Sequence, residues 1–167
     1  MRRVAHRWRR EARAWFDRAM SESESRVVRA SRVIAAPADV IFEEIADPSR
    51  QPAWDGNDNL GSAPEGQRVR ATGEVFSMTL GSGAVRENHV VEFEEGRRIA
   101  WKPAEEGKPP IGHLWRWELE PADGGTLVTQ TYDWTQLCDK SRLDRARRTQ
   151  EPQLLASIDR LKALLEG

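Results

Sequence analysis

The sequence has a single cysteine, Cys138, no long apolar segment and no excess of charge of one sign. One cysteine excludes an internal disulfide and a cysteine-rich metal site. It agrees with a reducing, cytoplasmic environment, which we expect for this chain. No apolar run approaches the ~20 residues that a membrane-spanning helix needs, so we expect no transmembrane segment. The 26 Lys and Arg residues stand against 27 Asp and Glu, and this balance provides no overall field that would attract nucleic acid.

Motifs of catalysis and cofactor binding are missing as well. The sequence has no HExxH, CxxC or GxSxG motif, and the Gly81-Ser82-Gly83 turn lacks the spacing and the following helix of a phosphate-binding loop. Its histidines and acids show no metal-ligand spacing, so we expect neither a metal nor another cofactor. What the sequence does contain is tryptophan, with seven residues that lie mostly in segments patterned like strands.

Residues 1–25 differ in composition from the rest of the chain. Within residues 1–20, arginines surround a helical face made of large apolar residues: Val4, Trp8, Trp15 and Phe16. A basic amphipathic helix of this kind can contact a membrane surface or a partner weakly. The alternatives are an appended helix of no consequence and translation that begins upstream of a working start at Met20. The SESES run is typical of a polar linker, so we expect one domain over residues 26–167.

Beyond the linker, the spacing of apolar residues predicts an α+β fold. Residues 26–34 predict a first strand, and the next residues have helical spacing, with Val40, Ile41, Phe42 and Ile45 pointing inward. A loop rich in Gly, Pro, Asn and Asp follows. Alternating residues then predict an antiparallel meander, with a short strand around Val69 followed by strands in these ranges: 74–80, 85–95, 97–103, 113–121 and 126–134.

The C-terminal segment predicts the longest helix. Leu154, Ile158, Leu161 and Leu165 form one stripe of Glu151–Glu166, and this stripe must pack on an apolar surface. Residues 141–150 predict a helical lead-in before it. The lead-in carries Asp144 among its arginines and lacks interleaved aromatics, which favours a solvated helix face.

Four segments together resemble a known superfamily: VIAAPADVIFEEIAD, PAWDGNDN, WRWELEPADGGTLVTQTYDW and LLASIDRLKALLE. In order and spacing they are similar to the SRPBCC superfamily, which includes START-related lipid-transfer domains, the birch-pollen-allergen fold and polyketide cyclase/dehydrase-like proteins. The resemblance covers about residues 26–166. It implies a helix-grip fold, in which a curved antiparallel sheet of about seven strands wraps the C-terminal helix around a deep apolar cavity. Carriers, sensors and cyclases share this fold, so function must come from the site.

The strand phases predict which side chains line that cavity. Trp54, in the loop after the first helix, either covers the cavity mouth or anchors its loop. The other predicted pocket residues are Phe76, Met78, Val91, Phe93, Trp101, Trp115, Trp117, Tyr132, Trp134, Leu154 and Ile158. Such a surface suits a hydrophobic or aromatic ligand, and the alternative is that these side chains simply fill the core.

Three polar residues share the predicted inward phase: Glu87, His89 and His113. If they converge, an imidazole and a carboxylate could form a general acid/base set for cyclisation or dehydration of a polyketide. The alternative is that they lie in water or have structural roles.

We therefore hold three hypotheses. The first is a non-catalytic protein that binds or carries a small lipid-like, polyketide or aromatic molecule. The second is a cyclase/dehydrase-type enzyme that uses Glu87, His89 and His113 within the cavity. The third is a surface interaction module like the chaperone-ATPase-activator branch, which predicts a filled interior and an exposed apolar patch.

Overall fold

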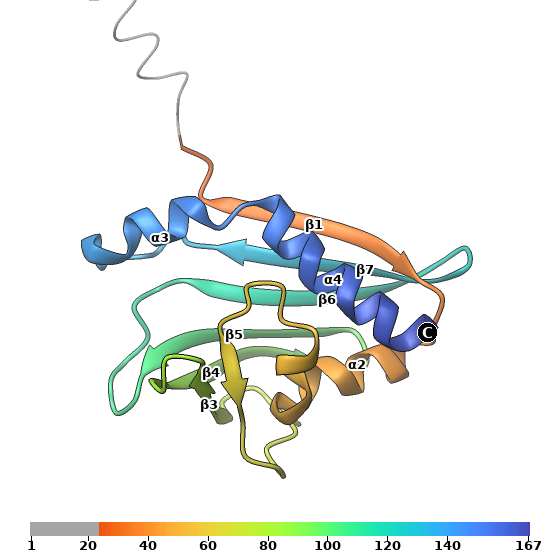
Figure 1. The fold of residues 1–167 in the computed structure, drawn as a ribbon, viewed down its shortest axis with the longest axis horizontal. Helices are drawn as coiled ribbons and strands as arrows, with labels where there is room; N and C mark the ends of the chain where they lie inside the picture. Colours follow the sequence, from red (N-terminus) through yellow and green to blue (C-terminus); the bar gives the residue numbers. More distant parts are fainter. Residues whose placement is uncertain (1–23) are drawn as a thin grey trace, which may run out of the picture.

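The computed structural model describes residues 24–167 (Figure 1), so the proposed basic helix and most of the linker lie outside the described residues. The strands are β1 Val27–Ile34, β2 Leu60–Ser62, β3 Val75–Leu80, β4 Val85–Glu94, β5 Arg98–Glu105, β6 Leu114–Ala122 and β7 Gly125–Asp133. The α-helices are α2 Ala38–Ala46, α3 Leu143–Arg148 and α4 Glu151–Glu166, and two 3₁₀ turns are Pro48–Ala53 and Lys140–Arg142.

All seven strands belong to one antiparallel sheet with the order β1-β7-β6-β5-β4-β3-β2. Strands β2 to β7 form a meander, and β1 closes the other edge by pairing with β7 along its whole length, from Val27 opposite Asp133 to Ile34 opposite Thr126. Figure 1 shows α4 running beside β1 and β7, with α2 near its C-terminal end. This is the helix-grip architecture that the sequence predicts.

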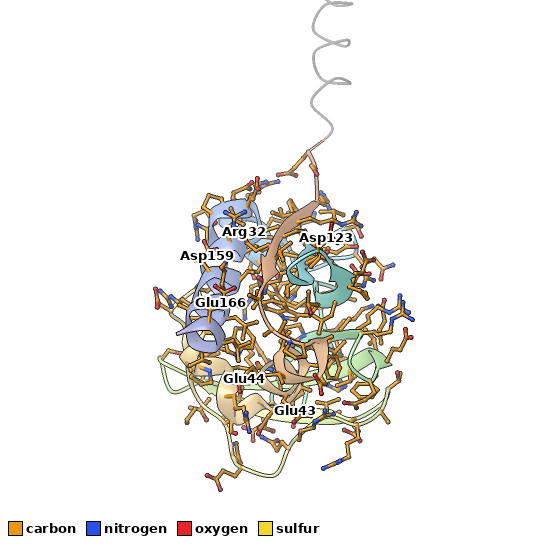
Figure 2. The ribbon with its side chains drawn as sticks, turned by 90° about the vertical axis from the view of Figure 1, so that its right-hand side faces the viewer. Arg32, Glu43, Glu44, Asp123, Asp159 and Glu166 are labelled. Carbon is orange, nitrogen blue, oxygen red and sulfur yellow. The ribbon has the colours of Figure 1, made fainter. Side chains whose placement is uncertain are left out.

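Helix α4 is fixed to the sheet by its apolar stripe and by polar contacts to β1. Leu154, Ile158 and Leu161 are at most 1% exposed, which makes hydrophobic burial the main stabilising term. The side chains of Arg32 and Asp159 lie 3.3 Å apart between β1 and α4 (Figure 2). Both are half-exposed, so this pair orients the helix more than it stabilises it.

The sequence misplaces one edge strand. Val69 forms no strand, because its backbone N–H donates to the Ala46 carbonyl at 2.9 Å and its side chain packs in the core beside α2. The edge strand is instead β2, which lies in the predicted loop and pairs irregularly with β3. The prediction that Val40 points inward is also wrong, since only one face of α2 meets the sheet and Val40 is 45% exposed.

A β-bulge in β4 changes which side chains face the concave side of the sheet. Val90 pairs with Trp101 and Glu92 pairs with Ala100, so Val91 is an extra residue without a partner. An extra residue shifts the alternation of a strand by one position. Val90 and Phe93 therefore both point inward, while Val91 is exposed.

Candidate functional site

A cavity of about 360 Å³ lies between the concave face of the sheet, the loop around Trp54 and the α3 region. This volume is within the range of small-molecule sites. Aliphatic residues such as Met78, Ile111 and Leu137 line part of the cavity, and five aromatic side chains line another part: Trp54, Trp101, Trp115, Trp117 and Tyr132. Strands β5, β6 and β7 supply four of these side chains, because Trp101 pairs with Trp115 and Trp115 with Tyr132 across the sheet.

Half of the predicted pocket residues line this cavity: Trp54, Met78, Trp101, Trp115, Trp117 and Tyr132. Val91 does not, because the bulge turns it outward. The other five lie in the packed core: Phe76, Phe93, Trp134, Leu154 and Ile158. The apolar stripe of α4 packs in the core, and the helix contributes Gln153 to the cavity wall. The expectation that Leu154 and Ile158 line the cavity is therefore wrong.

Trp54 is a fixed part of the cavity wall. Its indole N–H donates to the Glu44 carbonyl at 3.0 Å, and its ring meets Trp117 edge-on with centroids 5.1 Å apart. The residues after Trp54 are held against α4, where the Gly56 N–H donates to Ser157 Oγ at 2.9 Å. Of the two roles expected for Trp54, the geometry therefore favours anchoring its loop over covering the cavity mouth.

The predicted acid/base set does not assemble. Glu87 and His89 pair across the sheet with Ser77 and Val75, on the face opposite to Phe76 and Met78. Glu87 accepts a hydrogen bond from the Gly107 N–H at 3.1 Å, at the outer surface. Of the three residues, only His113 lines the cavity. Alternation counted back from Phe93 places Glu87 and His89 on the inner face only if β4 has no bulge, which is why this prediction fails.

The cavity-facing residues of β4 are instead Arg86 and Asn88. They lie opposite Met78 and Phe76, which fixes their side of the strand. Asn88 is 6% exposed. Alternation counted back from the buried Val90, in place of Phe93 beyond the bulge, gives both residues.

Two buried polar atoms in the cavity wall have no hydrogen-bond partner among the described residues: Trp117 Nε1 and Gln130 Oε1. Trp117 and Gln130 pair directly across β6 and β7, and both line the cavity. Buried donors and acceptors are nearly always paired in folded proteins, because an unpaired one costs about 1–3 kcal/mol. One donor and one acceptor therefore remain unpaired beside the cavity.

Burial also sets the ionisation of the two titratable groups nearby. It lowers the pKa of His113 to about 4, with further lowering from the positive charges of Arg142, Arg145 and Arg86. Burial raises the pKa of Tyr132 to about 12. At neutral pH both side chains are uncharged, and their rings meet edge-on at 6.1 Å. A neutral imidazole with so low a pKa is a weak base.

Arginines gather where β4 and β5 approach the α3 region, and Arg86, Arg142 and Arg145 all line the cavity. Arg142 pairs with Glu105 at 3.2 Å. Within residues 24–167, no acid lies at ion-pair distance from Arg86 or Arg145. Burial, and then the charge of Arg142, lower the pKa of Arg86. The prediction of a solvated face for the lead-in segment holds for Arg145, which is exposed although it borders the cavity, and is wrong for Arg142, which is half-buried.

The fold and the cavity define a helix-grip protein. The chain belongs to the polyketide cyclase / dehydrase and lipid transport family, whose sequence profile matches residues 25–166. This match confirms the resemblance to the SRPBCC superfamily. Among curated proteins, the chain is 32% identical over 105 residues to the uncharacterized protein Rv0088 of Mycobacterium tuberculosis, over 60% of this chain and 44% of that protein. The match thus spans less than half of that relative's length.

Solved structures share the fold at low sequence identity. Protein MLL2253 from Mesorhizobium loti matches with a TM-score of 0.61 and 18% identity over 84% of this chain and 97% of that chain. The Aha1 dimer from Colwellia psychrerythraea matches with a TM-score of 0.58 and 16% identity over 84% of this chain and 96% of that chain. At these identities the comparison establishes the fold and leaves function to the site. Within residues 24–167, no helix is long and apolar enough to cross a membrane.

Proposed function

We propose that this protein binds a small hydrophobic or aromatic molecule in the cavity and acts as a carrier or sensor. The observation that carries the proposal is a cavity of about 360 Å³ with five aromatic side chains in its wall and polar and charged side chains over the rest of its lining. In pockets for small molecules, apolar and aromatic side chains provide affinity and polar groups fix the orientation of the ligand. The family's association with polyketides and lipids supports the same ligand class.

Two other functions receive less support. A cyclase/dehydrase that depends on Glu87 and His89 lacks its geometry, because both side chains lie outside the cavity. A surface interaction module predicts a filled interior and a contiguous exposed patch. The large exposed apolar residues of the described chain instead come from separate elements: Val33, Val40, Val75, Val91 and Leu164. We propose the cytoplasm as the location, because the chain's one thiol, Cys138, is exposed and free.

The test is native mass spectrometry of the gently purified full chain, followed by extraction and identification of the adduct. We expect a stoichiometric hydrophobic adduct that is lost on denaturation. Ala146→Phe should abolish the adduct, because Ala146 is 1% exposed and faces the cavity from α3. Ala163→Phe, on the exposed face of α4, is the matched control and should retain the adduct. A free-protein mass together with no uptake of a lipophilic fluorophore would overturn the proposal.

A further inference from the structure

We propose that the ligand is an amphiphilic organic acid, with its anionic group at Arg86, Arg142 and Arg145 and a hydrogen-bonding group at its other end, between Trp117 and Gln130. The inference rests on the proposed function and adds the chemistry of the ligand. Two independent observations carry it: the excess positive charge on one side of the cavity and the unpaired polar atoms in its wall.

Among the described residues that line the cavity, the arginines exceed the acids by one, four against three. Four arginines line the cavity: Arg86, Arg142, Arg145 and Arg148. Three acids do so as well: Asp55, Glu105 and Asp139. The acids are already occupied. Asp55 accepts three backbone N–H groups, at Asn57, Asn59 and Leu60. Glu105 pairs with Lys108 at 2.5 Å and with Arg142, and Asp139 accepts from the backbone and hydroxyl of Ser141.

The arginines act on the interior of the cavity as well as on its rim. Arg145 and Arg148 are exposed, whereas Arg86 and Arg142 are half-buried. A partly desolvated guanidinium without a paired acid attracts a carboxylate strongly and binds it with charge-assisted hydrogen bonds. The same charges disfavour a cationic ligand, since the neighbouring His113 and Tyr132 are neutral at pH 7 and cannot offset them.

The buried polar pair fixes the other end of the ligand. Along β6 the inward residues run from His113, just before the strand, through Trp115 to Trp117. At a rise of roughly 3.3 Å per residue, His113 and Trp117 are about 13 Å apart along the strand. A hydroxyl can accept from Trp117 Nε1 and donate to Gln130 Oε1, so it would satisfy both atoms at once. An acid with an apolar body of about that length therefore matches the cavity at both ends.

The first test uses two probes that share an aromatic body. The anion 1-anilinonaphthalene-8-sulfonate and its neutral analogue N-phenyl-1-naphthylamine are titrated into the full 167-residue chain by fluorescence. Arg86→Gln and Arg145→Gln should each weaken binding of the sulfonate about tenfold and change binding of the neutral probe less than twofold. Arg86→Lys should keep most of the affinity because it keeps the charge.

Arg147→Gln is the matched control. Arg147 lies on the same helix, but it pairs with Glu24 and Asp144 and does not line the cavity. It should leave the affinity for both probes within twofold of the unmodified protein. Equal weakening by Arg145→Gln and Arg147→Gln would assign the effect to the overall charge of the helix and overturn the site.

The second test addresses the inner end by competition against the sulfonate probe. In the unmodified chain, we expect 10-hydroxydecanoate to compete several-fold better than decanoate. In Gln130→Met, we expect the two acids to compete equally well. Equal competition by the two acids in the unmodified chain as well as in the variant would overturn the assignment of the inner end. The outcomes also distinguish failure of the proposed function from failure of the acid proposal. If no protein binds the neutral probe, the proposed function is overturned. If the neutral probe binds but the arginine substitutions leave sulfonate binding unchanged, only the proposal of an acidic ligand is overturned.

Discussion

Trp117 and Gln130 pair across β6 and β7 in the wall of the cavity, and each has a buried polar atom without a hydrogen-bond partner among the described residues. Their strands are otherwise fully paired along this stretch. The two unpaired atoms thus mark a place where the fold accepts a local cost. Such costs are expected at functional positions, where a ligand supplies the missing contact.

Gln130→Met tests that local cost in the free protein. The substitution keeps the length of the side chain and removes the unpaired amide oxygen, so we expect the free energy of unfolding to stay level or rise by about 1 kcal/mol. Gln51→Met is the control, because the Gln51 amide donates to the Ile45 carbonyl at 3.0 Å in the core. It should lose about 1–2 kcal/mol. Urea denaturation measures both, and equal losses would mean that Gln130 has a partner in the free protein.

His113 predicts a specific pH dependence of stability. Burial lowers its pKa to about 4 in the folded chain, from 6.5 for a histidine in water. Between these values the unfolded chain binds a proton that the folded chain does not, so stability falls as the pH drops below about 6.5. From pH 7 to pH 5 this group alone should cost about 2 kcal/mol.

The comparison for this dependence is His113→Phe, which keeps a ring against Tyr132 and cannot be protonated. Urea denaturation at pH 7 and pH 5 measures how much free energy of unfolding each protein loses on acidification. This loss should be about 2 kcal/mol smaller in the variant than in the unmodified chain. Proton NMR of His113 should show no titration down to about pH 5. The same loss of stability in both proteins would contradict the prediction.

Gly56→Ala should detach the cavity wall from α4. A Cβ at this position would lie 2.4 Å from the Ser157 backbone nitrogen and 2.8 Å from the Ala156 carbonyl carbon, both of which belong to a packed helix. We expect a loss of about 2 kcal/mol of stability and weaker ligand binding, because Trp54 moves with the loop. Gly81→Ala is the control, since its nearest neighbour would be 3.8 Å away. Equal effects of the two substitutions in thermal unfolding would argue against the close packing.

Adjacent residues of β4 test which face lines the cavity. Asn88→Phe should reduce binding of N-phenyl-1-naphthylamine at least tenfold, because the new ring would enter the cavity, where affinity depends on the space left for apolar contact. His89→Phe places the same ring on the opposite face and should leave the affinity within twofold. Fluorescence titration of both variants measures this, and a reversed result would restore His89 to the cavity.

Much of the site could be read from the sequence where strands are regular. In β6 and β7 the alternation places Trp115, Trp117 and Tyr132 on one face, and all three line the cavity. In β4 the same reasoning fails, because the bulge at Val91 shifts the alternation of inward and outward side chains by one residue. The local sequence pattern does not indicate this extra residue. Asn88 and Arg86 were missed for that reason.

The sequence by itself determined the periodic elements, the antiparallel meander and the long C-terminal helix, because these follow from the spacing of apolar residues over short stretches. The tertiary structure alone decided which apolar stripe fills the core and which side chains border empty space. Leu154 and Ile158 pack against the sheet, while Arg142 and Arg145 face the cavity. These choices depend on contacts between segments far apart in the chain, and local spacing carries no information about them.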